Sequence, residues 1–222
     1  ESEMIAGCHG VSSGSNWTNF IETIFDLIFS FYVQLELKDK YKVSGLYAIG
    51  DDMSWYLPSY EEDFSSDLEE LGVKVGQVIK AEKTTNDRDK VKTLQRLFQR
   101  GYSTVGNDNL RGVYPTIRAL NSLVYPEKFH KPKLWNSNMF CARTYMILEN
   151  CVDHPLFPEF VNFVVHGQRD LIKFAHSTDK KLSRITRLSK LLPGLNPTYN
   201  AEKKDSSLAN FASIAWVREN LK

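Results

Sequence analysis

The chain has 222 residues, of which 42% are hydrophobic and 25% are charged, and its net charge is +1. These values are typical of a globular protein with a buried core and exclude a disordered chain, while the near-zero net charge does not by itself indicate a nucleic-acid binder. Its three cysteines are widely spaced and odd in number, which argues against a disulfide scaffold and fits a reducing compartment. The longest apolar stretch, residues 20–33, contains Glu22 and Asp26, so we expect no membrane span.

The first predicted elements are a loop and an amphipathic helix. Residues 10–17 are rich in glycine and serine and predict a loop, from which Ser15 or Asn16 would cap the helix. Apolar side chains follow at helical spacing and predict a wide stripe that faces the core, formed by Phe20, Ile21, Ile24, Phe25, Leu27, Ile28 and Phe31. A polar face is expected opposite this stripe, where Thr18, Glu22 and Asp26 recur at four-residue steps.

A β-hairpin is predicted next, because Gly50-Asp51-Asp52 lies between two β-rich runs, 42–49 and 53–58. An acidic helix over 61–72 would end at Gly72, and a strand over 74–79 would follow it. The segment 91–102 mixes apolar and basic residues and fits either a second hairpin or a helix. Its periodicity does not decide between the two.

From about residue 104 the pattern becomes mostly helical. The helix-periodic segments are 116–124, 138–150, 156–175, 180–192 and 207–221. Pro155 and Pro158 suit a helix start, and Cys141 and Cys151 lack the spacing of zinc modules and are expected to be buried or incidental. The order of elements predicts an α+β fold, in which a mixed unit precedes an all-helical one.

A Gly-Asp-Asp triplet alone is weak, since hairpin turns favour Gly and Asp for conformational reasons. Here it belongs to an ordered set: "GVSSGSNWTN" upstream, then "YAIGDDMSWY", "LGVKVGQVIKAEKT" and "VKTLQRLFQRGY". These stretches resemble motifs B, C, D and E of the palm of viral RNA-dependent RNA polymerases. "RALNSLVYPEKF" then resembles the region after the palm in polymerases of the partitivirus and picobirnavirus type. The resemblance covers roughly the first 130 residues, and the last 80 or so carry no motif.

The resemblance implies a partial palm over residues 1–103, with an antiparallel hairpin and helices, and a mainly helical thumb over 104–222. It also implies template-directed RNA synthesis by two-metal nucleotidyl transfer with Mg²⁺ or Mn²⁺, in which the ions hold the attacking and leaving oxygens. Asp51 would be the main metal ligand of this chain and Asp52 a second, weaker one. The alternative for Asp52 is a solvated turn carboxylate.

Further roles come from the same resemblance. Ser13, Gly14, Ser15 and Thr18 would contact the incoming nucleotide or the template, and Asn19 would read a ribose 2′-hydroxyl. Many such enzymes carry Asn four residues after the motif B threonine, where this chain has Glu22. Lys83 would give a proton to the departing pyrophosphate, or else be a solvated turn lysine. Arg96 and Arg100 would contact primer or template phosphates.

Polymerases of this kind also carry a motif A, with an aspartate that holds both metals, and fingers that close over the nucleotide. Nothing before Gly10 matches motif A, so the chain is expected to be an incomplete piece, inactive alone, that needs the missing fingers and N-terminal palm. The expected partners are an RNA template, a primer or product strand and nucleoside triphosphates, and the expected location is the host cytoplasm or the virion. Two alternatives stay open: a reverse-transcriptase palm, and a non-catalytic nucleic-acid-binding or interaction domain with a coincidental turn.

Overall fold

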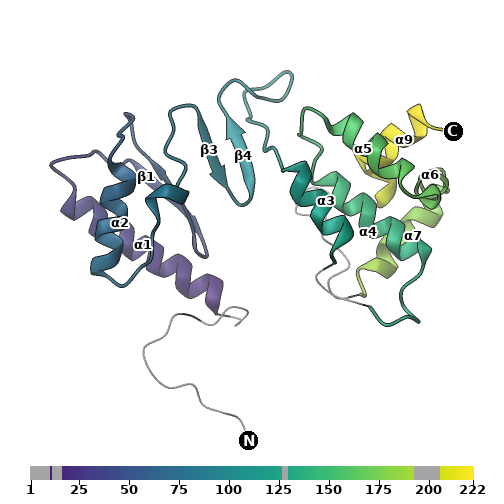
Figure 1. The fold of residues 1–222 in the computed structure, drawn as a ribbon, viewed down its shortest axis with the longest axis horizontal. Coiled ribbons are helices and arrows are strands. Elements are labelled where there is room, and N and C mark those ends of the chain that lie inside the picture. Colours follow the sequence, from purple (N-terminus) through teal and green to yellow (C-terminus); the bar gives the residue numbers. More distant parts are fainter. Residues whose placement is uncertain (1–10, 12–16, 127–129, 193–205) are drawn as a thin grey trace, which may run out of the picture. The chain divides into compact units, whose positions relative to one another are not determined.

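The structure is a computed structural model that describes residues 11, 17–126, 130–192 and 206–222. The chain forms two compact units, and the division between them passes through a strand near residue 95. The first unit contains Glu1–Leu94 with Phe98–Gly101, and the second contains Gln95–Leu97 with Tyr102–Lys222. The first is mixed and the second is mainly helical (Figure 1), so the α+β prediction is confirmed.

The first unit begins with helix α1 (Thr18–Glu36), followed by the antiparallel strands β1 (Gly45–Ile49) and β2 (Asp52–Tyr56). The register pairs Gly45 with Tyr56 and Ile49 with Asp52, as expected for a tight hairpin. Helix α2 (Phe64–Lys74) and the short 3-10 helix η1 (Ala81–Lys83) come next. A small aromatic core joins α1, β2 and α2, in which Trp55 packs edge-on against Phe29 and Phe64.

The ambiguous segment after η1 is a hairpin and not a helix. Its strands are β3 (Lys90–Thr93) and β4 (Arg96–Gln99). The turn between them has only two residues, Leu94 and Gln95, both with positive φ. The strand predicted over 74–79 was wrong: α2 continues to Lys74, past Gly72, and the chain then runs in a turn and extended coil. The missing side chain of Gly72 leaves room for the returning chain, whose Gln77 amide donates to the Gly72 carbonyl at 2.8 Å.

The orientation predicted for α1 was also wrong. Its polar face lies inward, where Asp26 is 1% exposed, whereas Phe20, Ile28 and Phe31 are 59%, 63% and 67% exposed. The reason is that this polar face packs beside the β1–β2 turn, whose main-chain groups need hydrogen-bond partners. The rest of the apolar stripe is exposed within the described residues of its own unit, except Phe25, which packs against Phe29.

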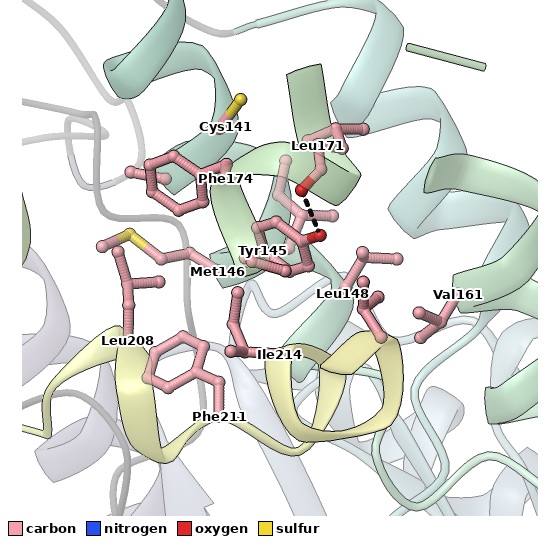
Figure 2. Packing of buried hydrophobic residues seen from close by; sticks show 14 of the residues in the cluster. Cys141, Tyr145, Met146, Leu148, Val161, Leu171, Phe174, Leu208, Phe211 and Ile214 are labelled. Carbon is pink, nitrogen blue, oxygen red and sulfur yellow. Dashed lines mark hydrogen bonds between the residues drawn. The ribbon is translucent and has the colours of Figure 1, made fainter. Parts of the chain in front are cut away.

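The second unit is a helical bundle around α4. Its helices, in chain order, are α3 (Thr116–Val124), α4 (Ser137–Glu149), α5 (Phe157–His166), α6 (Arg169–Ala175), α7 (Asp179–Ser189), η2 (Leu208–Asn210) and α9 (Ala212–Asn220). Side chains all round α4 are buried, Cys141 among them, and Cys151 is buried just after it. Figure 2 shows Tyr145 of α4 stacked near Phe174, with its hydroxyl donating to the Leu171 carbonyl at 2.8 Å.

Two details of the second unit differ from or refine the predictions. The helix expected over 156–175 is two helices, because the chain breaks at Gly167–Gln168 and Gln168 caps α6. Pro158 lies in the first turn of α5, as predicted. In α7, Leu182 and Ile185 are buried while Lys181, Arg184 and Arg187 are exposed, so the helix has a core side and a basic side.

In the described ranges, no helix is both long and apolar enough to cross a bilayer.

Candidate active site

The candidate site is the turn between β1 and β2. Gly50 and Asp51 form the turn, and Asp52 is the first residue of β2. Gly50 has a φ of +61°, in the left-handed region that glycine adopts without a steric penalty. Asp51 is exposed at the tip, so its carboxylate is free to meet a ligand from solvent.

The first turns of α1 hold this turn in place. The Gly50 amide donates to Thr23 Oγ1 at 2.8 Å, and the Thr23 hydroxyl donates to the Asn19 carbonyl at 2.7 Å. The Asn19 side chain lies directly over the turn, because a Cβ built on Gly50 would come within 2.9 Å of Asn19 Oδ1. Position 50 therefore favours glycine for its φ, and a Cβ there would also require the Asn19 side chain to shift.

Asp26 lies one helical turn further along α1 and is the most unusual group near the site. Its side chain is buried, and its Oδ2 has no hydrogen-bond partner among the described residues. Burial is the main cause that raises the pKa of Asp26 to about 6, and the neighbouring carboxylates Asp51 and Glu22 raise it further. Three carboxylates from α1 and the hairpin thus share one electronegative neighbourhood, which favours a cation.

Asp52 is not a free turn carboxylate. Its Oδ2 accepts a hydrogen bond from the Leu94 amide at 2.5 Å, and the Thr93 hydroxyl is 3.5 Å from the same oxygen. Both partners belong to the end of β3 and the turn after it. One carboxylate oxygen is therefore committed to the second hairpin, and Oδ1 remains for another ligand.

The other predicted residues are placed as follows. Thr18 and Asn19 open α1, while Ser13, Gly14 and Ser15 lie outside the described residues. Lys83 ends η1, which packs against α2, and its side chain is exposed. Within the described part of the chain, no hydrogen bond or ion pair joins Lys83 to the β1–β2 turn.

The two arginines differ in what they contact. Arg96, in the second unit, donates to the Gly112 carbonyl at 2.9 Å and the Asn150 carbonyl at 3.1 Å, and its guanidinium lies over the Tyr114 ring. Those bonds fix β4 to the end of α4. Arg100, in the first unit, is largely exposed and is 3.4 Å from Asp89. Arg100 is thus the arginine with the freer guanidinium.

A divalent cation fits this site only in part. Asp51 and Oδ1 of Asp52 are the oxygens it would use, which suits Mg²⁺, since that ion takes few carboxylates and keeps waters or phosphates. Among the described residues, no three acidic, histidine or cysteine side chains are placed to share one metal ion. The chain therefore offers a partial ligand set.

Sequence reasoning missed Thr23 and the burial of Asp26. The helical pattern places Asp26 on the polar side opposite the core, although a carboxylate within a strongly apolar helix is itself a signal that something polar packs there. Thr23 carried no such signal, because a threonine next to a glutamate on a helix is ordinary. Its role depends on the hairpin that packs against it.

By fold, the chain is similar to part of a viral RNA-dependent RNA polymerase. The crystal structure of the RNA-dependent RNA polymerase of a human picobirnavirus matches with a TM-score of 0.75 and 23% identity, over 96% of this chain and 39% of that chain. Its insertion-loop deletion mutant matches with a TM-score of 0.67 and 25% identity, over 96% of this chain and 38% of the other. No protein-family model matches the chain.

The sequence comparison leads to a relative of the same kind. A potential RNA-dependent RNA polymerase of Human picobirnavirus is 28% identical over 167 residues, which are 75% of this chain and 30% of the relative. The resemblance to viral polymerases of the picobirnavirus type is thereby confirmed. The chain spans between 30% and 39% of the length of these relatives.

Proposed function

We propose that this chain is part of an enzyme that synthesises RNA on an RNA template. The observation that carries the proposal is the Gly50-Asp51-Asp52 turn, held by hydrogen bonds on the first turns of the helix that follows the Gly/Ser loop. The similarity to polymerases named for this activity supports it. The Asn19 side chain contacts Gly50, so the start of α1 and the Gly-Asp-Asp turn lie together. This arrangement favours the polymerase over a non-catalytic domain with a coincidental turn.

In this proposal Asp51 is the main cation ligand of the chain, and Oδ1 of Asp52 is a second one. Mg²⁺ or Mn²⁺, when bound, neutralises charge on the attacked phosphate and on the leaving oxygen. Asp51 suits the role because it is exposed at the tip of a rigid hairpin. The buried carboxylate of Asp26 adds negative potential behind the turn, which strengthens the attraction of the site for a cation.

The remaining residues bind and orient substrates. Ser13, Gly14, Ser15 and Thr18 contact the nucleotide or template, and Asn19 contacts the ribose next to the turn. Lys83, exposed on η1, donates a proton to the departing pyrophosphate. Arg100 contacts a strand phosphate, and Arg96 acts there only through the N–H groups that its two carbonyl contacts leave free.

We further propose that the rest of a polymerase completes the site and covers α1. The metal ligand set is partial, the chain spans about a third of its relatives, and the apolar stripe of α1 is exposed. The missing parts are the fingers and the palm segment with motif A, so the chain alone does not synthesise RNA. The partitions 1–103 and 104–222 serve as part of the palm and as the thumb, and the enzyme works in the host cytoplasm or the virion.

The test is Mg²⁺- or Mn²⁺-dependent RNA synthesis on a primed RNA template, with the longer parent protein, its Asp51→Ala variant and this chain alone. We expect synthesis by the parent, a loss of at least about a thousandfold in Asp51→Ala and none from the chain. Unchanged synthesis in Asp51→Ala would remove Asp51 from the metal site. Incorporation of deoxynucleotides in preference to ribonucleotides would point to a reverse transcriptase.

A further inference from the structure

The turn between β3 and β4 has an unfavourable sequence for its conformation. Leu94 has a φ of 47° and Gln95 a φ of 65°, so both central residues are left-handed. Two-residue hairpin turns of this kind normally carry Asn-Gly or similar pairs, because residues with a Cβ rarely adopt positive φ. A leucine and a glutamine here need a contact outside the turn to hold them.

Asp52 supplies that contact. Its Oδ2 accepts from the Leu94 amide at 2.5 Å, with the Thr93 hydroxyl at 3.5 Å. The N–H of the first turn residue is not used by the ladder of a two-residue hairpin, so it is free to donate outward. A hydrogen bond from an amide to a charged carboxylate is stronger than one between neutral groups. β2 and β3 lie next to each other at this point.

We propose that Asp52 is a positioning residue that fixes the β3–β4 turn beside the candidate metal site. Oδ2 holds the turn through Leu94, while Oδ1 stays available to a cation. The negative charge of Asp52 thus links the two hairpins, and its loss would release the second hairpin even with Asp51 in place. The link to catalysis rests on the proposed function, whereas the hydrogen bond and the turn geometry do not.

The experiment is amide hydrogen exchange on this chain, read in peptides covering 90–99 and 45–56. We expect Asp52→Ala to speed exchange over 90–99 by about tenfold or more and to leave 45–56 nearly unchanged. Asp52→Asn keeps an acceptor oxygen and should show a smaller increase. Asp51→Ala is the matched control, because it removes the neighbouring carboxylate without touching the Leu94 bond.

A rescue variant keeps the result specific. Leu94→Asn with Gln95→Gly gives the turn a favourable sequence, so adding both changes to Asp52→Ala should restore slow exchange over 90–99. The proposal is overturned if Asp52→Ala exchanges like the parent chain, if Asp51→Ala has the same effect, or if the rescue fails. Hydrogen exchange does not depend on polymerase activity, so the two proposals can fail separately. If the exchange results are as expected but the longer protein makes no RNA, this proposal stands and the proposed function is rejected.

Discussion

Asp26 is a carboxylate that destabilises the fold in which it is buried. Its pKa rises from 3.8 to about 6 on folding, mainly because burial penalises the charged form. Between these two values the folded chain binds more protons than the unfolded chain. The free energy of unfolding therefore falls as the pH rises through this window, and the full penalty remains above it.

We expect Asp26→Asn to stabilise the chain by roughly 1–3 kcal/mol at about pH 8, with the gain shrinking toward zero below about pH 4. The amide keeps the shape of the side chain and removes the buried charge that faces Asp51 and Glu22. Urea unfolding at several pH values measures the effect, and the exposed Asp39→Asn is the control. A gain that is equal at both ends of the pH range would show that charge is not the cause.

Gly50 gives a second prediction for a single residue. Gly50→Ala would place a Cβ at 2.9 Å from Asn19 Oδ1. The alanine would also have to adopt a φ of +61°. We expect a loss of about 2–3 kcal/mol in the free energy of unfolding, somewhat more than conformational strain alone, because the end of the Asn19 side chain must also shift.

Two other glycines serve as controls that separate the effect of the positive φ from the effect of the Asn19 contact at position 50. Gly76 has a φ of +80° with nothing near its absent Cβ, so Gly76→Ala should lose only about 1 kcal/mol. Gly45, in β1, has neither the positive φ nor a close neighbour, so Gly45→Ala should change little. Equal losses in Gly50→Ala and Gly76→Ala would mean that the Asn19 contact does not matter.

Among the secondary-structure elements, α9 depends on a side chain far away in the sequence. Glu149, at the end of α4, is fully buried and accepts from the amides of Ala212 and Ser213 and from the Ser213 hydroxyl, at 3.1–3.3 Å. These are donors at the first turn of α9, which have no partner within the helix. A carboxylate there also interacts favourably with the helix dipole.

We expect Glu149→Ala to lower the free energy of unfolding by about 3 kcal/mol, because buried donors of α9 lose their acceptor. Glu149→Gln keeps one acceptor oxygen and should lose less. Chemical denaturation measures both, and Glu159→Ala, an exposed position in the first turn of α5, is the control within about 0.5 kcal/mol. A loss no larger than in the control would show that α9 is held by apolar packing alone.

Local sequence signals predicted those elements whose turn residues or apolar periodicity are sufficient to define them. The β1–β2 hairpin follows from Gly-Asp between β-rich runs, and α3 has the predicted bounds, 116–124. The strand expected over 74–79 failed because a valine-rich run predicts a strand only if another strand pairs with it, and Val78 is instead exposed. The break at Gly167 was hidden because apolar periodicity continues across it.

The sequence predicts the Gly50-Asp51-Asp52 turn of the candidate site, but it does not predict the side chains that pack around that turn. The triplet and its ordered companions point to Asp51 and Asp52 from sequence, and their role as metal ligands stays a prediction. Which face of α1 meets the turn was not predictable, because periodicity separates two faces without saying what covers each one. The bond from Leu94 to Asp52 joins residues 42 positions apart, and no local pattern encodes such a pairing.

The whole molecule presents one large feature that its own first unit does not explain, the apolar face of α1. Ile28 and Phe31 are 63% and 67% exposed on a helix whose opposite face buries a carboxylate. Contiguous apolar patches of this kind mark surfaces that another protein segment covers. The solved relative is covered only to 39% of its length, so under the proposed function there is ample further chain to cover this face.

We therefore expect Ile28→Lys with Phe31→Glu, a pair that keeps the net charge, to be tolerated in this chain but not in a longer protein that contains it. In this chain both positions are exposed, so the free energy of unfolding should change by less than about 0.5 kcal/mol and concentration-dependent self-association should fall. In the longer protein that the proposed function requires, the same pair would bury two charges, so unfolding should become easier by several kcal/mol, roughly 3 or more, and the proposed RNA synthesis should be lost.

Light scattering and urea unfolding of both proteins measure these effects, beside a control pair on the second unit, Val105→Lys with Val124→Glu. Those valines are 99% and 59% exposed and lie outside the α1 face, so the control should leave self-association of this chain unchanged. Equal tolerance of the α1 pair in chain and parent would show that the face stays open in the complete protein. A large loss in the longer protein alone would support the proposal that further polymerase chain covers the apolar face of α1.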